Sequence, residues 1–123
     1  MNAAEKDLTI DMDISLEDIN AAHERIKDNV IRTPLVRATR LSMQTGIDLW
    51  LKLENLQHTG AFKARGALNK LLSLNEEQRK TGVIACSAGN HAQGVAFHAQ
   101  RIGAPATIVM PKGTPFNKIQ KTE

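Results

Sequence analysis

The sequence has 123 residues, of which 41% are hydrophobic and 24% are charged, and its formal net charge is +3. This composition is typical of a single globular domain, and no apolar run approaches the roughly 20 residues that a membrane span needs. Its only cysteine is Cys86, so an internal disulfide framework is excluded and a cytoplasmic location without membrane partners is expected.

The positive charge is spread along the chain and does not form one patch. The first 24 residues hold seven acidic residues and one lysine, so the excess of basic residues lies in the remainder. Aromatic residues make up only 3% of the chain, whereas surfaces that bind nucleic acids combine basic patches with aromatic side chains. We therefore expect no nucleic-acid partner.

The first predicted elements are a capped helix and a strand. Ser15 and Asp18 form the pattern of a capping box, and apolar residues then recur at helical spacing as far as Val30. Pro34 is expected to lie beyond the end of this helix, because proline breaks a helical pattern. Residues 49–54 alternate leucine with other side chains, and this alternation predicts a strand.

Helices and strands alternate through the rest of the chain. This order is typical of a parallel sheet with crossover helices, so the predicted fold class is α/β. We expect the three strands to join one parallel sheet. The predicted strands lie at 49–54, 83–86 and 106–110, and the predicted helices lie within 58–74, from the segment SAGNHAQG to about Ile102, and from about Pro115.

Two strand-to-helix junctions, ENLQHTGAFK and SAGNH, carry the candidate chemistry. In an open parallel sheet, ligands gather at the carboxyl ends of strands, where helix N-termini present free N–H groups. The two junctions are therefore expected to face one crevice. In the second junction, Ser87, Ala88 and Gly89 let a carboxylate or phosphate approach the backbone, and Asn90 offers a donor and an acceptor.

Lys63 stands at the start of a helix whose other inward positions are apolar. A helix N-terminus and the neighbouring Arg65 both disfavour an ammonium there, so a nucleophilic amine is one interpretation. Lysines of this kind bond covalently to carbonyl compounds, including pyridoxal phosphate. The residues alone also allow a lysine that merely begins the helix and reaches solvent.

The segments LKLENLQHTGAFKARGALNKL and ACSAGNHAQGVAFHA, in this order and spacing, resemble the threonine ammonia-lyases, or threonine dehydratases. These are fold type II pyridoxal-phosphate enzymes with a tryptophan synthase beta-like fold. The resemblance runs from about Ser15 to the end. It implies that residues 1–123 are the N-terminal portion of such a lyase domain, with the C-terminal remainder absent. The implied reaction dehydrates and deaminates L-threonine, and also L-serine, to a 2-oxo acid and ammonia.

The resemblance also implies a role for each residue of the two junctions. Lys63 is then the lysine that bonds to the cofactor and takes the substrate's α-proton. Phe62 packs against the cofactor ring, and Asn90 donates a hydrogen bond to the phenolic oxygen of the cofactor. The substrate carboxylate lies on the backbone amides of Ser87, Ala88, Gly89, Asn90 and His91. The family's glycine-rich phosphate loop does not occur in this sequence, so an inactive fragment is expected.

Two alternatives stay open beside the dehydratase. A serine racemase of the same family needs a second proton-transfer group directly after Ser87, where this sequence has Ala88. A gene remnant or partner-dependent fragment would not be an enzyme. The full-length parent is expected to be a homo-oligomer acting on a small amino acid, and its role in isoleucine biosynthesis or in threonine catabolism is left open.

The histidines and the cysteine favour structural roles. His23, His58, His91 and His98 are dispersed and have no acidic residue or Cys86 grouped with them, so no metal site is expected. We expect His91 to open a helix and His98 to lie on the surface. Cys86 is expected to be a small buried hydrophobe and not a nucleophile.

Overall fold

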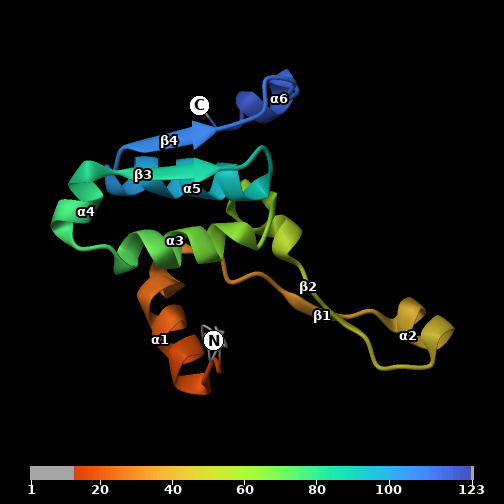
Figure 1. The fold of residues 1–123 in the computed structure, drawn as a ribbon. Coiled ribbons are helices and arrows are strands. Elements are labelled where there is room, and N and C mark those ends of the chain that lie inside the picture. Colours follow the sequence, from red (N-terminus) through yellow and green to blue (C-terminus); the bar gives the residue numbers. More distant parts are fainter. Residues whose placement is uncertain (1–12, 123) are drawn as a thin grey trace, which may run out of the picture.

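The computed structural model describes residues 13–122, which form helices around two short sheets (Figure 1). The first half of the chain contains α1 (Leu16–Ile26), the 3₁₀ turn η1 (Lys27–Asn29), β1 (Leu35–Arg37), α2 (Thr39–Thr45), β2 (Trp50–Lys52) and the 3₁₀ turns η2 (Glu54–Leu56) and η3 (His58–Gly60). The second half contains α3 (Lys63–Ser73), α4 (Glu76–Thr81), β3 (Val83–Cys86), α5 (Asn90–Ile102), β4 (Ala106–Val109) and α6 (Phe116–Ile119).

Short-range hydrogen bonds fix where α1 begins. The hydroxyl of Ser15 accepts from the Asp18 N–H at 3.1 Å, and the Ser15 N–H donates to the Asp18 carboxylate at 3.0 Å. This reciprocal pair is the predicted capping box, and it satisfies two N–H groups at the helix start. The helix ends earlier than predicted, because α1 stops at Ile26 and the chain is extended at Val30.

The α/β class is confirmed by the unit β3–α5–β4. Strands β3 and β4 are parallel, with Val83 opposite Ala106 and Cys86 opposite Val109. Helix α5 is the crossover between them and covers one face of the pair (Figure 1). It ends at Gly103, whose φ of 70° is a left-handed conformation that glycine adopts readily.

The prediction that the strand within 49–54 joins the parallel sheet is wrong. Strand β2 pairs antiparallel with β1 in a separate sheet, where Leu35 lies opposite Lys52 and Arg37 opposite Trp50. Figure 1 shows this pair and α2 extending away from α3 and α5. Alternation of apolar and polar residues identifies a strand but does not identify its partner, and here α2 reverses the chain so that neighbouring strands run antiparallel.

The core lies between α3 and α5, which run parallel to each other. Ala67 packs near Val95 in one buried cluster, and Leu71 packs near Ala99 in a second cluster farther along both helices. The two N-termini therefore lie at the same end of the pair. Helix α3 buries Ala64, Ala67, Leu68 and Leu71, as its apolar spacing predicts, and α5 buries Ala92, Gln93, Gly94, Val95, His98 and Ala99.

Within the described residues, no helix combines the length and the apolar character that crossing a bilayer requires.

Candidate active site

The two predicted junctions meet through a close contact between α3 and α5. Lys63 is the first residue of α3, and Asn90 is the first residue of α5. One turn into α5, Gly94 lies against the first turn of α3. A Cβ at Gly94 would be 3.2 Å from the Lys63 carbonyl oxygen and 3.3 Å from the Ala64 nitrogen. The missing side chain therefore allows the helix start that carries Lys63 to lie beside the first turns of α5.

The side chains of Phe62 and Lys63 are both exposed at this end. The Lys63 Nζ lies 5.2 Å from the centroid of the Phe62 ring, within the range of a cation–π contact. Phe62 is 61% exposed, so its ring is not covered by the described residues. Among residues 13–122, no carboxylate forms an ion pair with the Lys63 amine. The amine and the ring are therefore both available to a ligand.

Arg65 is engaged by Glu54 and does not act on Lys63 as a free charge. Its Nε and one terminal nitrogen each donate to the Glu54 carboxylate at 2.8 Å, and the same terminal nitrogen donates to the Ile31 carbonyl at 3.0 Å. Hydrogen bonds from Arg65 and then from Thr33 lower the pKa of the Glu54 carboxyl to about 2, against the opposing effect of burial. The charge of Arg65 is therefore paired with an adjacent carboxylate.

The Ser87–Gly89 loop leads directly from β3 into α5. The Ser87 N–H donates to the Val109 carbonyl at 3.0 Å, which extends the parallel ladder by one residue. The Ser87 hydroxyl then accepts from the Gly89 N–H at 3.2 Å and tightens the loop. Gly89 is the N-cap of α5 and has no side chain to accept from the first turn. Backbone N–H groups at such an uncapped start favour an anionic ligand.

The burial or exposure of His98, Cys86 and Gln57 was predicted wrongly or was not predicted from the sequence. His98 is buried, with 1% exposed, because α5 is covered by η3 and its aromatic neighbours as well as by α3. Cys86 is exposed, because its strand face is left open by the described residues. The predictions of a surface His98 and a buried Cys86 are therefore wrong. Gln57, at 4% exposed, was not singled out, since a polar residue between two turns has no periodic signal.

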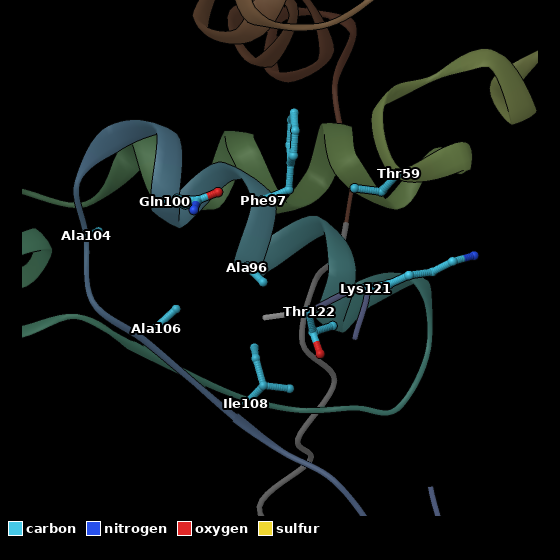
Figure 2. Close-up of a pocket in the computed structure, with 9 residues that line it drawn as sticks. All are labelled: Thr59, Ala96, Phe97, Gln100, Ala104, Ala106, Ile108, Lys121 and Thr122. Carbon is cyan, nitrogen blue, oxygen red and sulfur yellow. The ribbon is translucent and has the colours of Figure 1, made fainter. Parts of the chain in front are cut away.

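A separate hollow of about 290 Å³ lies between α5, β4 and the C-terminal turn (Figure 2). Neither Lys63 nor the loop at 87–91 lines it, so it is distinct from the candidate site. In Figure 2 the Lys121 side chain extends away from the other lining residues. The lining residues are Thr59, Ala96, Phe97, Gln100, Ala104, Ala106, Ile108, Lys121 and Thr122.

Residues 26–123 match the protein family described as pyridoxal-phosphate dependent enzyme. The chain belongs to this family. One relative is the L-threonine ammonia-lyase of Thermotoga maritima. The two sequences are 58% identical over 109 residues, which is 89% of this chain and 27% of the relative. The catabolic L-threonine dehydratase TdcB of Escherichia coli K12 is 42% identical over 94% of this chain and 35% of the relative.

Solved structures of the pyridoxal-phosphate family have the same fold. The structure of maize serine racemase matches with a TM-score of 0.83 and 40% identity, over 88% of this chain and 33% of that one. The predicted resemblance and the fold type II assignment are therefore confirmed. The chain spans between about a quarter and about a third of the length of the proteins it matches.

The residues of this end fit the cofactor of the pyridoxal-phosphate family. The Lys63 amine, which forms no ion pair within residues 13–122, suits the aldehyde carbon of pyridoxal phosphate, and the exposed ring of Phe62 beside it suits the flat face of the pyridine. Gly94 was also missed by the sequence analysis, although a glycine inside a helical pattern commonly marks a close packing contact.

Proposed function

We propose that this chain supplies the cofactor-attachment part of a pyridoxal-phosphate lyase that acts on L-threonine, and also on L-serine. The products are a 2-oxo acid and ammonia. The observation that carries the proposal is the pairing of two helix starts through Gly94, with Lys63 on one and the SAGNH loop before the other. The high identity to proteins named threonine ammonia-lyase and threonine dehydratase supports the choice of substrate.

Each proposed role is the one that the family resemblance implies, and the position of the residue is compatible with it. The Lys63 amine would hold the cofactor, and as a free amine it would take the proton from the substrate Cα. Bound pyridoxal phosphate withdraws electrons from that carbon, which makes the proton acidic enough to remove. The exposed ring of Phe62 packs on the cofactor, and the Asn90 amide donates to its phenolic oxygen.

The substrate is held by its carboxylate in this proposal. The backbone N–H groups of the loop from Ser87 to His91, at the uncapped start of α5, donate to the two carboxylate oxygens. The proposal requires that a substrate held in this way would present its Cα to the Lys63 amine. The sequence has no glycine-rich run for the cofactor phosphate, so we propose that the 123 residues alone are not an active lyase.

The role of Lys63 is tested in a chimera in which this chain replaces the 109 matched residues of the Thermotoga maritima relative. We expect the chimera to form 2-oxobutyrate from L-threonine and to absorb visible light when loaded with pyridoxal phosphate. Lys63→Ala should abolish both properties, and Lys70→Ala, an exposed lysine of the same helix, should abolish neither. After borohydride reduction, peptide mapping should find the pyridoxyl group on AFKAR. A label on another lysine, or full activity in Lys63→Ala, contradicts the assignment.

A racemase is the second candidate, because the maize serine racemase structure is so similar to this chain. Removing and returning a proton on opposite faces of the substrate requires a second proton-transfer group. Ala88 lies directly after Ser87 and has no such group. We therefore expect the chimera to convert L-serine to pyruvate with little D-serine, and Ala88→Ser to raise the share of D-serine. Rapid D-serine formation by the unmodified chimera would favour the racemase.

We further propose a cytoplasmic enzyme that forms homo-oligomers and serves either isoleucine biosynthesis or threonine catabolism. An exposed thiol at Cys86, the only cysteine of the chain, suits a reducing compartment. Gel filtration of the chimera measures the oligomeric state directly.

A further inference from the structure

The ring of His58, in η3 shortly before Lys63, contacts two aromatic rings of α5. The His58 ring lies 5.0 Å from that of Phe97, measured between centroids, and 6.2 Å from that of His98. Phe97 and His98 themselves are 4.9 Å apart, with their planes at 78°. The planes of His58 and Phe97 meet at 31°, whereas those of His58 and His98 meet at 82°. All three separations lie within the range of favourable aromatic pairs. The ring of His58 therefore contacts two rings of α5.

His98 is the buried member of this group of three rings. It is 1% exposed, and neither ring nitrogen has a hydrogen-bond partner among the described residues. A buried polar ring without partners is unfavourable in the folded state, so apolar packing alone does not explain a histidine here. Burial and then the charge of Arg101 lower the pKa of His98 to about 4, and the same two effects lower the pKa of His58. The surroundings of the two rings therefore favour the uncharged form of both imidazoles.

The turn next to these rings contains a backbone conformation that is unfavourable for its residue. Thr59 has a φ of 60°, although it is not glycine, and Gly60 follows with a φ of 68°. A β-branched residue in the left-handed region persists only where surrounding contacts hold it. On one side, the Gln57 side chain bonds to both backbone groups of Ile31, at 2.9 and 2.8 Å. On the other side, the ring of His58 contacts the rings of Phe97 and His98.

We propose that His58, seated against Phe97 and His98, is a positioning residue that fixes the turn leading into Lys63 relative to α5. The inference rests on the proposed function for the importance of Lys63, but the contact itself is independent of any cofactor. Gly94 sets the distance between α3 and α5 at the first turn of α3. In the proposal, His58 sets the position of the turn that leads into this helix. Without the ring, the turn at Thr59 has less to hold it and Lys63 loses its fixed place beside the SAGNH loop.

The test compares His58→Ala with His58→Phe in the full 123-residue chain by hydrogen exchange. We expect amide exchange in the segment from Gly60 to Ala64 to rise about fivefold in His58→Ala, the size expected when a ring contact is lost. His58→Phe keeps an aromatic ring and should restore the slow exchange. His23→Ala, on α1, is the matched control and should leave this segment unchanged. Exchange that is equal in His58→Ala and the parent overturns the inference.

A second measurement in the chimera separates this inference from the proposed function. His58→Ala should weaken the visible absorption and circular dichroism of the loaded chimera, and His58→Phe should restore both. If exchange rises in His58→Ala while Lys63 takes no pyridoxyl label in the unmodified chimera, the positioning role stands and the proposed function fails. If exchange rises but the visible signals of the labelled chimera do not change, the turn does not position Lys63 and the inference is overturned.

Discussion

At the scale of single residues, Gly94 is a position where a small change should disturb the contact between α3 and α5. A methyl group there would lie 3.2 to 3.3 Å from backbone atoms of Lys63 and Ala64, which cannot rotate away. Gly94→Ala must therefore push α3 and α5 apart, and we expect it to lower the free energy of unfolding by about 1–3 kcal/mol. Urea denaturation of the 123-residue chain measures this change.

Gly66 provides a matched control for this prediction. It lies inside α3, and a Cβ there would meet no atom within 4 Å. Gly66→Ala should raise the free energy of unfolding by roughly 0.5–1 kcal/mol, because alanine restricts the unfolded chain and favours helix. Equal effects of the two substitutions would contradict the close contact at Gly94.

Among the residues of the candidate site, those with local signals were predictable and those defined by distant contacts were not. Lys63 could be singled out because it interrupts an apolar pattern, and Ser87 and Gly89 because small residues follow a strand. His98 could not be placed, because its burial depends on the ring of His58, forty residues earlier in the chain. No window of sequence contains both residues together with their packing.

At the scale of elements, the ion pair between Glu54 and Arg65 joins η2 to α3 across the turn that precedes Lys63. Pairing with Arg65 lowers the pKa of Glu54 from 4.5 to about 2 in the folded chain. Because the folded value is below the unfolded one, this stabilisation is fully present above about pH 4.5 and is lost as the pH falls toward 2. A shift of this size corresponds to at most about 3 kcal/mol.

Glu54→Gln should remove that part of the pH dependence. We expect it to destabilise the chain at pH 7 by about 1–3 kcal/mol, because Arg65 keeps a partly buried charge without its partner, and to matter much less at pH 2. Thermal unfolding at the two pH values measures the difference. Glu76→Gln breaks an exposed pair with Lys80 and should change stability by less than about 0.5 kcal/mol. A pH dependence in Glu54→Gln as steep as that of the parent argues against the ion pair.

The elements themselves were predicted better than their pairing. The strand at 83–86 and the helix from the SAGNH loop to Ile102 have the expected bounds, because glycines and apolar runs mark their ends in the local sequence. All residues of strands β1 and β2 are exposed. The sequence therefore contains no burial pattern from which the separate pairing of these two strands could be predicted. Helices α2 and α4 were missed, since both are short and bury none of their residues.

At the scale of the whole molecule, the described residues cover one face of the sheet of β3 and β4 and leave the other face open. Ile108 packs on the buried cluster beneath α5, whereas Ile84 is 78% exposed and Val109 is 48% exposed on the opposite face. Large apolar side chains gathered on an open face lower solubility and promote aggregation. The 123-residue chain should therefore scatter light at concentrations where a typical small domain stays clear.

Replacing an open-face isoleucine with lysine should relieve this tendency without disturbing the fold. Ile84→Lys removes an apolar group that is already in water, so we expect the unfolding free energy to change by no more than about 0.5 kcal/mol and light scattering to fall. The same substitution at Ile108, on the strand beside it, places a charge against the buried cluster and should cost at least about 2 kcal/mol. Urea denaturation together with light scattering of both variants makes the comparison. Similar destabilisation by the two lysines would mean that the open face is packed as closely as the face beneath α5.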